Sequence, residues 1–289
     1  MSEIVSIKGA GLAAEINPLG AELHALRDAD GRDLLWDGDP AFWTGRAPIL
    51  FPVIGCVNGG VIRVDGKEYP MAKHGFARRR HFTVIAQDEG SATFSLADDD
   101  ETRKSYPFAF RLDIRFAIEG EALTLTATAH NLGDTPMPAS FGFHPALRWP
   151  LPYSGARADH RIRFDAVEPE PIRRIDGDGF LRPAPVPSPI EGDTLTIRDD
   201  LFSDDAVILD APHARGLAYG APGTPGLRVE WDLPQLGIWT KPGAPYLCIE
   251  PWAGIADPEG FVGDIFDKPG IVAIPAGESH SFSMKIARD

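Results

Sequence analysis

The chain has 289 residues, of which 43% are hydrophobic and 24% charged, with 30 glycines and 27 prolines. This composition is typical of a turn-rich globular protein and excludes the disordered and fibrous classes. The formal net charge is −14, from 42 acidic and 28 basic residues, so the field of the protein repels phosphate backbones and anionic lipid. We therefore expect no nucleic-acid partner.

The sequence also predicts a cytoplasmic protein without a membrane segment. Its first residues, MSEIVSIKGAG, lack a basic n-region, and no run approaches the ~20 apolar residues of a membrane span. The two cysteines, Cys56 and Cys248, lie too far apart for a CxxC site and make no disulfide framework. We expect both to be buried thiols, as free cysteines usually are.

The first predicted elements are two hairpins and one short helix. The hairpin strands are Val61–Val64 with Glu68–Met71, around Asp65-Gly66, and Phe82–Ala86 with Ala92–Leu96, around Asp88-Glu89-Gly90. The helix is expected at Asp100–Tyr106, because an acidic run precedes it and Pro107 stops it.

The next elements complete an all-β pattern. Apolar and polar residues alternate from Phe110 to Ile118, and a second strand follows at Leu123–Ala129 after the turn at Glu119-Gly120-Glu121. The Pro-rich and Gly-rich stretch from Glu168 to Pro189 predicts a long surface loop or an insertion over one end of the fold. The last strand is expected at Ser281–Ala287. Because the residues after the loop look like sheet completion, residues 1–289 are predicted to form a single domain.

The chemistry-bearing candidates lie in four islands that mix polar and aromatic residues. The chain has no GxGxxG, GxxxxGK[ST], HExxH or GxSxG motif. The islands are Arg46–Pro52, His74–Arg78, Phe141–Pro145 and Trp239–Trp252. Each places an ionisable residue among aromatics, glycine or proline, which favours a functional pocket built from loops and strand ends.

His144 and Glu250 are the candidate catalytic pair. The apolar run before Glu250 predicts a buried carboxylate, which is costly unless it is paired or functional. A histidine and a glutamate in one pocket supply a general acid and a general base. The alternatives without catalysis are a structural role for His144 in the core or in a turn and a structural salt bridge for Glu250. His74, Arg46 and Arg78 are candidate donors to a substrate, and Asp205 a candidate acceptor.

No metal site is expected. His74, His144 and His213 are the histidines considered beside Glu250, and no two of them have the short spacing common in metal sites.

Taken together and in order, the islands resemble the aldose 1-epimerase (mutarotase) superfamily, and specifically its bacterial aldose 1-epimerase-like branch. The resemblance covers nearly the whole chain. Its motifs are Gly20–Leu23, Trp36, Arg46, Phe51-Pro52, His74–Arg78, Tyr106–Phe108, Phe141–Pro145, Asp205-Ala206, Leu236–Trp239 and Cys248–Trp252. It implies an all-β fold, a large antiparallel β-sandwich of the galactose mutarotase type (a supersandwich) with few short helices, a sugar cleft, and no cofactor.

The resemblance also implies roles for single residues. His144 matches the general acid of the family and Glu250 its general base, which together open the sugar ring and close it as the other anomer. His74 and Asp205 match residues that bind substrate hydroxyls, and Arg46 matches an active-site arginine more loosely. The expected function is a cofactor-independent aldose 1-epimerase acting on a small-molecule sugar, as a monomer or as a homodimer through an exposed sheet edge.

Three alternatives stay open at this point. One is a non-catalytic sugar-binding or sensing protein on the same fold. Another is a hexose-6-phosphate 1-epimerase, since a related branch uses arginines near the equivalents of Arg46 and Arg78, and Arg78–Arg80 form a basic cluster. The third is a glycan lyase or hydrolase, for which Asp205 and Glu250 are the available carboxylate pair.

Overall fold

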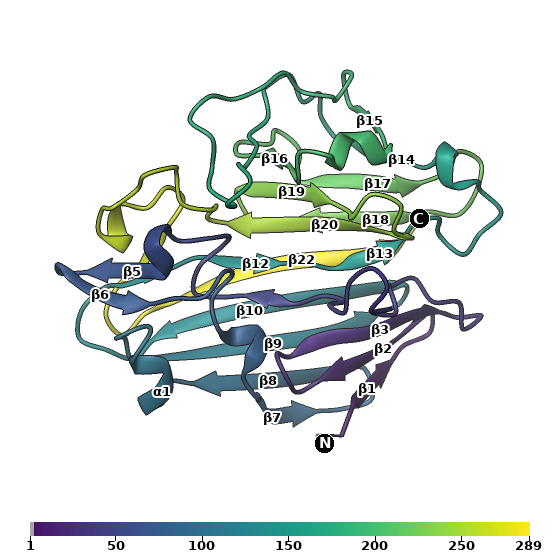
Figure 1. The fold of residues 1–289 in the computed structure, drawn as a ribbon. Helices are drawn as coiled ribbons and strands as arrows, with labels where there is room; N and C mark the ends of the chain where they lie inside the picture. The colour runs from purple at the N-terminus through teal and green to yellow at the C-terminus, as the bar shows by residue number, and fades with distance from the viewer. Residues whose placement is uncertain (1–2) are drawn as a thin grey trace.

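The computed structural model describes residues 3–289, which form two main antiparallel sheets (Figure 1). The larger sheet has nine strands in these residues, and the C-terminal strand β22 lies in its centre between β18 and β10. In spatial order its strands are β15 (Thr194–Thr196), β14 (Arg161–Phe164), β17 (Gly216–Gly220), β18 (Leu227–Trp231), β22 (Ser279–Arg288), β10 (Ala122–Asn131), β9 (Phe110–Glu119), β8 (Ser91–Ala97) and β7 (Thr83–Gln87). The expected antiparallel β-sandwich is confirmed; the prediction of a single domain stays a prediction.

The smaller sheet carries the residues of interest. Its strands are β16 (Val207–Leu209), β19 (Gln235–Trp239), β20 (Tyr246–Ala253), β12 (Phe141–Phe143) and β4 (Ile49–Leu50), with β13 (Ala146–Arg148) also paired to β20. In Figure 1 the yellow strand β22 of the large sheet passes behind β12 and β13. The ring of Phe141 stacks on that of Phe282 at 5.1 Å between centroids, which joins the two sheets face to face.

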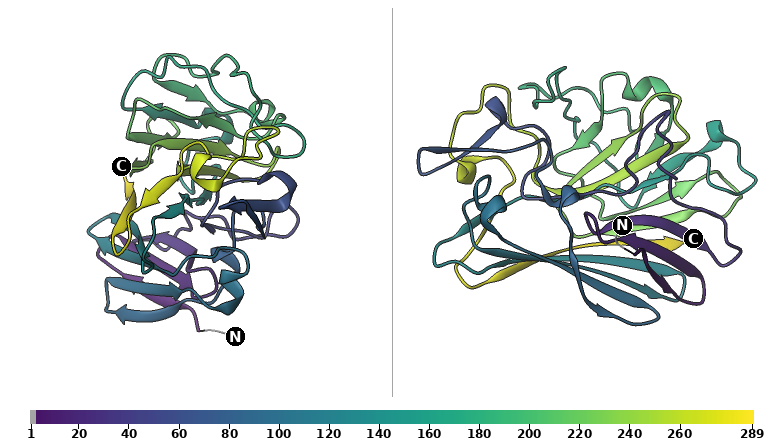
Figure 2. Two further views of the ribbon diagram at one scale, coloured as in Figure 1. Left: turned by 90° about the vertical axis from the view of Figure 1, so that its left-hand side faces the viewer. Right: turned by 60° about the horizontal axis from the view of Figure 1, so that its bottom comes forward.

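Short elements complete the description of the fold (Figure 2). The remaining strands are β1 (Val5–Lys8), β2 (Leu12–Asn17) and β3 (Glu22–Asp28) in one sheet, β5 (Val61–Val64) with β6 (Lys67–Pro70), and β11 (Met137–Ala139) with β21 (Val272–Ile274). The helices are α1 (Asp100–Arg103) and the 3₁₀ turns Asn58–Gly60, Ala77–Arg79, Arg157–Asp159, Asp199–Phe202 and Ile265–Asp267. None of the helices in residues 3–289 has the length and apolarity to cross a membrane.

All three predicted hairpins are confirmed, with strand ends shifted by one or two residues. The helix at Asp100 is shorter than predicted and ends at Arg103, after one turn capped by the side chain of Asp99. The expectation that both cysteines are buried is wrong for Cys56, which is only half-buried, and right for Cys248.

Strand β20 is buried along its whole length because both of its faces are covered. Leu247, Ile249 and Ala253 point into the main core between the two sheets. Cys248 and Trp252 point to the opposite face, where they join two smaller apolar clusters. Since side chains alternate along a strand, Glu250 shares this second face and lies between the two clusters.

Candidate active site

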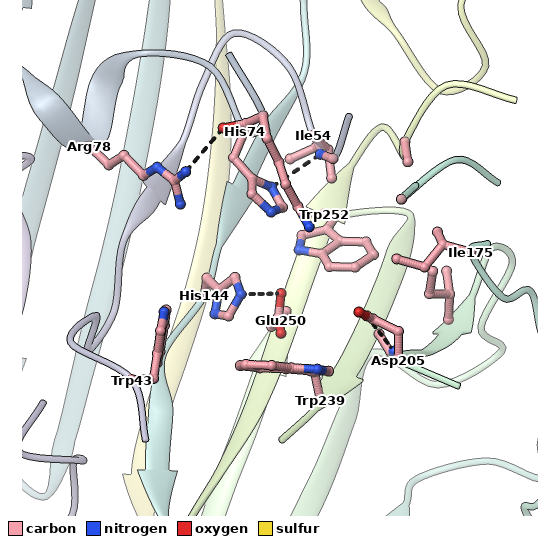
Figure 3. A pocket seen from close by; sticks show the side chains of 16 residues that line it. Trp43, Ile54, His74, Arg78, His144, Ile175, Asp205, Trp239, Glu250 and Trp252 are labelled. Atoms are coloured by element: carbon pink, nitrogen blue, oxygen red, sulfur yellow. Dashed lines mark hydrogen bonds and ion pairs between the residues drawn. The ribbon is translucent and has the colours of Figure 1, made fainter. Parts of the chain in front are cut away.

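The sheet register brings His144 and Glu250 together. Gly142 on β12 pairs with Trp252 of β20, and Ala146 on β13 pairs with Cys248. His144 lies midway between β12 and β13, so it stands opposite Glu250 across the same ladder. Its Nε2 is 3.1 Å from Oε2 of Glu250 (Figure 3). His144 and Glu250 are far apart in the chain, and they meet because the strand register places them opposite each other.

Two glycines make room for the indole of Trp252 beside this pair. A Cβ on Gly142 would lie 2.7 Å from Cδ1 of Trp252, and one on Gly237, the β19 partner of Glu250, would overlap the six-membered ring of the indole. Glycine at both positions lets the indole lie flat over the sheet next to the carboxylate.

A cavity of about 260 Å³ opens above the pair. Its lining includes Trp43, Lys73, His74, Arg78, His144, Ile175, Gly179, Asp205, Trp239, Glu250 and Trp252. The cavity therefore brings together five of the six sequence-predicted site residues. In Figure 3, Arg78 and Trp43 lie on one side of the His144–Glu250 pair, and Asp205 and Ile175 lie on the other.

Arg46, the sixth predicted site residue, is not part of this lining. Its guanidinium donates to the carbonyl of His24 at 2.7 Å, and its backbone N–H donates to Glu22 at 2.8 Å. Its backbone carbonyl accepts the N–H of Ala146, the first residue of β13. These contacts hold the first island against the sheet.

His74 is oriented by its own backbone and by a neighbouring loop. It has a φ of +64° and is followed by Gly75, whose Cβ, if present, would overlap the Phe51 carbonyl. Nδ1 of His74 accepts the N–H of Gly55 at 3.1 Å. The remaining ring nitrogen, Nε2, is therefore the one that carries the proton and is available as a donor.

Burial controls the charges of the site. Desolvation raises the pKa of Glu250 well above its usual value, and the charge of Asp205 raises it further. The nearby indole N–H of Trp252 opposes this rise, although it forms no hydrogen bond. Desolvation also lowers the pKa of His144 to about 3, with Arg78 and Lys73 contributing. Both shifts favour a neutral hydrogen bond with one shared proton over an ion pair.

Desolvation likewise lowers the pKa of His74 well below its usual range, and the neighbouring His144 adds to the effect. Arg78 is half-buried, and its pKa falls through desolvation and the nearby charge of Arg79. Neither Arg78 nor Lys73 forms an ion pair within residues 3–289; Arg78 donates instead to the backbone carbonyl of Lys73 at 3.1 Å. The cavity therefore has a cationic edge without partner carboxylates.

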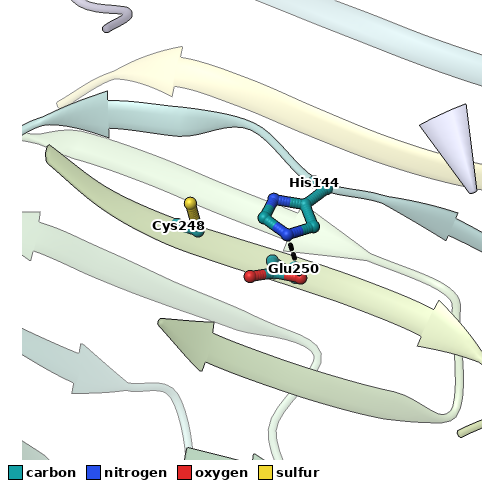
Figure 4. Close-up of side chains that lie close together, drawn as sticks. All are labelled: His144, Cys248 and Glu250. Carbon is teal, nitrogen blue, oxygen red and sulfur yellow. Dashed lines mark ion pairs between the residues drawn. The ribbon is translucent and has the colours of Figure 1, made fainter. Parts of the chain in front are cut away.

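The residues of the site that could together bind a metal are not the set that was considered from the sequence. His144, Cys248 and Glu250 each offer a ligand atom, and these atoms lie within 4.8 Å of one another (Figure 4). His213, considered from the sequence, is exposed and borders a different cavity. The absence of a metal requirement stays a prediction.

Comparison with known proteins agrees with this architecture. A sequence model described as Aldose 1-epimerase matches residues 3–287. The chain belongs to the aldose 1-epimerase family. Protein LacX (plasmid) of Lactococcus lactis is 30% identical over 283 residues, covering 93% of this chain and 94% of that protein.

Solved structures of family-like proteins superpose over nearly the whole chain. A galactose mutarotase-like protein from Lactobacillus casei has a TM-score of 0.92 at 30% identity, covering 99% of this chain and 100% of that one. A galactose mutarotase related enzyme from Lactobacillus acidophilus has a TM-score of 0.89 at 27% identity, covering 99% and 97%. The fold of this family member is therefore of the galactose mutarotase type, as the sequence resemblance implied.

Sequence reasoning did not assign several residues of the cavity. Lys73 directly precedes the His74–Arg78 island, and this position in the sequence could have identified Lys73 as a candidate site residue. Trp239 begins the fourth island but was given no role of its own, and Trp43 lies outside the four islands. Ile175 and Gly179 come from the loop predicted at residues 168–189, and only the tertiary structure shows that this loop borders the cavity.

Proposed function

We propose that the protein interconverts the α and β anomers of a free aldose by general acid–base catalysis, with no cofactor. The observation that carries this proposal is the contact of 3.1 Å between Nε2 of His144 and Oε2 of Glu250 at the base of a sugar-sized cavity. A pair that holds one proton supplies both groups that the reaction needs, one to give a proton and one to take it.

The reaction then follows from hemiacetal chemistry. Glu250 takes the proton of the C1 hydroxyl while His144 gives a proton to the ring oxygen, so the C1–O5 bond breaks and the aldehyde forms. Rotation about C1–C2 presents the other face of the carbonyl, and reversal of both transfers closes the ring. In this assignment the shared proton moves from Glu250 to His144 when a sugar binds, because hydroxyl groups that hydrogen-bond to a carboxylate favour its charged form.

The remaining residues of the cavity bind and orient the sugar. The Nε2–H of His74 donates to a hydroxyl, and the exposed carboxylate of Asp205 accepts from another. Trp43 and Trp239 offer aromatic faces on which the C–H face of a pyranose ring stacks.

The test is anomer exchange measured by NMR magnetisation transfer with glucose and galactose. The wild-type protein should accelerate exchange, and His144→Asn and Glu250→Gln should each lower kcat by about 10²–10⁴-fold. His280→Asn, an exposed histidine on β22, is the matched control and should retain full activity. If the protein binds these sugars without accelerating their exchange, the non-catalytic binding alternative replaces the proposal.

A second candidate, an aldose-phosphate 1-epimerase, is favoured by the cationic edge of the cavity. Lys73 and Arg78 have no carboxylate partner in the described residues, and lysine and arginine side chains are common phosphate ligands. Glucose 6-phosphate in the same assay decides between the two. A higher kcat/KM for the phosphate, lost in Arg78→Met while glucose is unaffected, would favour the phosphosugar.

A further inference from the structure

Cys248 offers a third ligand atom beside the His144–Glu250 pair, and the proposed reaction does not use it. Its Sγ, one oxygen of Glu250 and one ring nitrogen of His144 lie within 4.8 Å of one another. In a tetrahedral Zn²⁺ site, with Zn–S of about 2.3 Å and Zn–N and Zn–O of about 2.1 Å, the ligand atoms stand about 3.3–3.6 Å apart. The His144–Glu250 contact of 3.1 Å already has nearly this spacing. Side-chain movements of about 1 Å therefore bring all three atoms to metal-binding distances.

The backbone holds the three side chains on one side of the small sheet. Cys248 and Glu250 are two residues apart on β20 and point to the same face, and His144 reaches this face from between β12 and β13 (Figure 4). Two ligands at positions i and i+2 of a strand are kept about 6.8 Å apart at their Cα atoms. Because β20 is buried along its whole length, the ligand set is in place before a metal arrives.

Two buried polar atoms of this region have no hydrogen-bond partner in residues 3–289. They are Nδ1 of His144 and the hydroxyl oxygen of Tyr246. Burial raises the pKa of Tyr246, and the charges of Cys248 and Glu250 raise it further, so the hydroxyl is close enough to both groups to feel their charge. Buried polar atoms without partners are uncommon in folded proteins. An anionic ligand at Cys248 or Glu250 gives the Tyr246 hydroxyl an acceptor.

The ligand set selects Zn²⁺ among the common divalent cations. Thiolate sulfur and imidazole nitrogen suit Zn²⁺, whereas Mg²⁺ and Ca²⁺ take oxygen ligands. A thiolate and a carboxylate together balance the two positive charges of the ion. Binding releases two protons, one from the thiol and one from the His144–Glu250 pair, so it leaves the net charge of this buried site unchanged.

We propose that His144, Cys248 and Glu250 form an inhibitory Zn²⁺ site at the base of the cavity. The ion enters through the cavity, which His144 and Glu250 line, and a water molecule takes its fourth position. Bound Zn²⁺ occupies both groups of the proton pair, so neither can give or take a proton. The inhibition rests on the proposed function, whereas the metal site itself does not. Zn²⁺ is here a competitor of the substrate and not a cofactor.

Co²⁺ in place of Zn²⁺ tests the site without any measurement of catalysis. The untagged wild-type protein should bind Co²⁺ with the visible bands of a tetrahedral complex and a near-ultraviolet charge-transfer band from thiolate to metal, and added Zn²⁺ should remove both. Cys248→Ser should lose the charge-transfer band. Its Kd for Zn²⁺ should rise about 100-fold or more, because even residues that only support metal ligands contribute about 10–100-fold.

Cys56→Ser is the matched control. Cys56 is half-buried and is not a member of the ligand set, so this variant should keep the charge-transfer band. The chain has only two cysteines. A band that remains in Cys56→Ser is thereby assigned to Cys248, even if Cys248→Ser does not fold.

Anomer exchange tests the inhibition. Zn²⁺ should slow exchange in competition with the sugar, a chelator should restore the rate, and Mg²⁺ should have no effect. Cys248→Ser should keep the wild-type rate without metal, because the thiol takes no part in the proton transfers. Half-inhibition of this variant should need about 100-fold more Zn²⁺ than that of the wild type.

The Co²⁺ spectra and the exchange rates separate failure of this inference from failure of the proposed function. A wild-type Co²⁺ complex without the thiolate band would overturn the inference, as would a band that is lost in Cys56→Ser and kept in Cys248→Ser. A saturated metal site that leaves anomer exchange unchanged would also overturn it. If the protein accelerates exchange of no sugar, the proposed function fails, and the Co²⁺ spectra still decide whether the metal site exists.

Discussion

The acid limb of the pH profile tests the shared proton of His144 and Glu250. Ring opening needs one proton on the pair, so activity is lost when a second proton binds. Burial raises the pKa of Glu250 and lowers that of His144 to about 3, which means that the second proton binds only in strong acid. At pH 5, a histidine of ordinary pKa is about 97% protonated, whereas one with a pKa of about 3 is about 1% protonated.

The assay is kcat/KM for anomer exchange between pH 4 and pH 9, corrected for the spontaneous reaction at each pH. We expect kcat/KM to change by less than about twofold between pH 7 and pH 5. If both groups had ordinary pKa values, His144 would gain its proton near pH 6.5 and Glu250 only near pH 4.3, so the one-proton pair, and with it kcat/KM, would rise about threefold over the same range. The alkaline limb should lie well above the usual pKa of a glutamate, where the last proton leaves the pair.

Histidine NMR spectra of the ¹⁵N-labelled protein identify the group, since the signal missing in His144→Asn belongs to His144. A rise of about threefold between pH 7 and pH 5, with the His144 signal titrating near pH 6.5, would refute the argument from burial. His280→Asn should leave the pH profile of the wild type unchanged.

Two further predictions concern the supports of the site. Gly75→Ala should destabilise the protein by about 3 kcal/mol or more in urea unfolding, because alanine at a φ of +72° is strained and its Cβ would overlap the Phe51 carbonyl; a loss below about 1 kcal/mol would show that the turn relaxes. Lys268→Met should cost about 3–5 kcal/mol, because it leaves the carboxylate of Asp257, which is buried and paired with Lys268, without a counter-charge. Lys285→Met, at an exposed ion pair, is the control and should cost about 1 kcal/mol or less; equal losses in the two lysine variants would contradict the burial argument.

Local patterns in the sequence were sufficient for most of the large sheet. The alternation from Phe110 to Ile118 and the turn at Gly120 predict β9 and β10, because a strand with one face on the core places apolar residues at every second position. The acidic run before residue 100 predicts a helix cap for the same local reason. Strand β20 gives no such alternation, since it is buried on both faces, and its apolar run indicates only that Glu250 is enclosed.

The sequence by itself thus determined the all-β class, three hairpins and, through the resemblance of its motifs, the family, in which His144 and Glu250 are the expected catalytic pair. Tertiary structure decided which groups meet. The pairing of β12 and β13 with β20 sets His144 opposite Glu250. The loop at residues 168–189 borders the cavity. Arg46 donates to the backbone carbonyl of His24 and does not line the cavity. These contacts join segments distant in the chain, and pairing register and side-chain burial are properties of the packed sheets that no local pattern encodes.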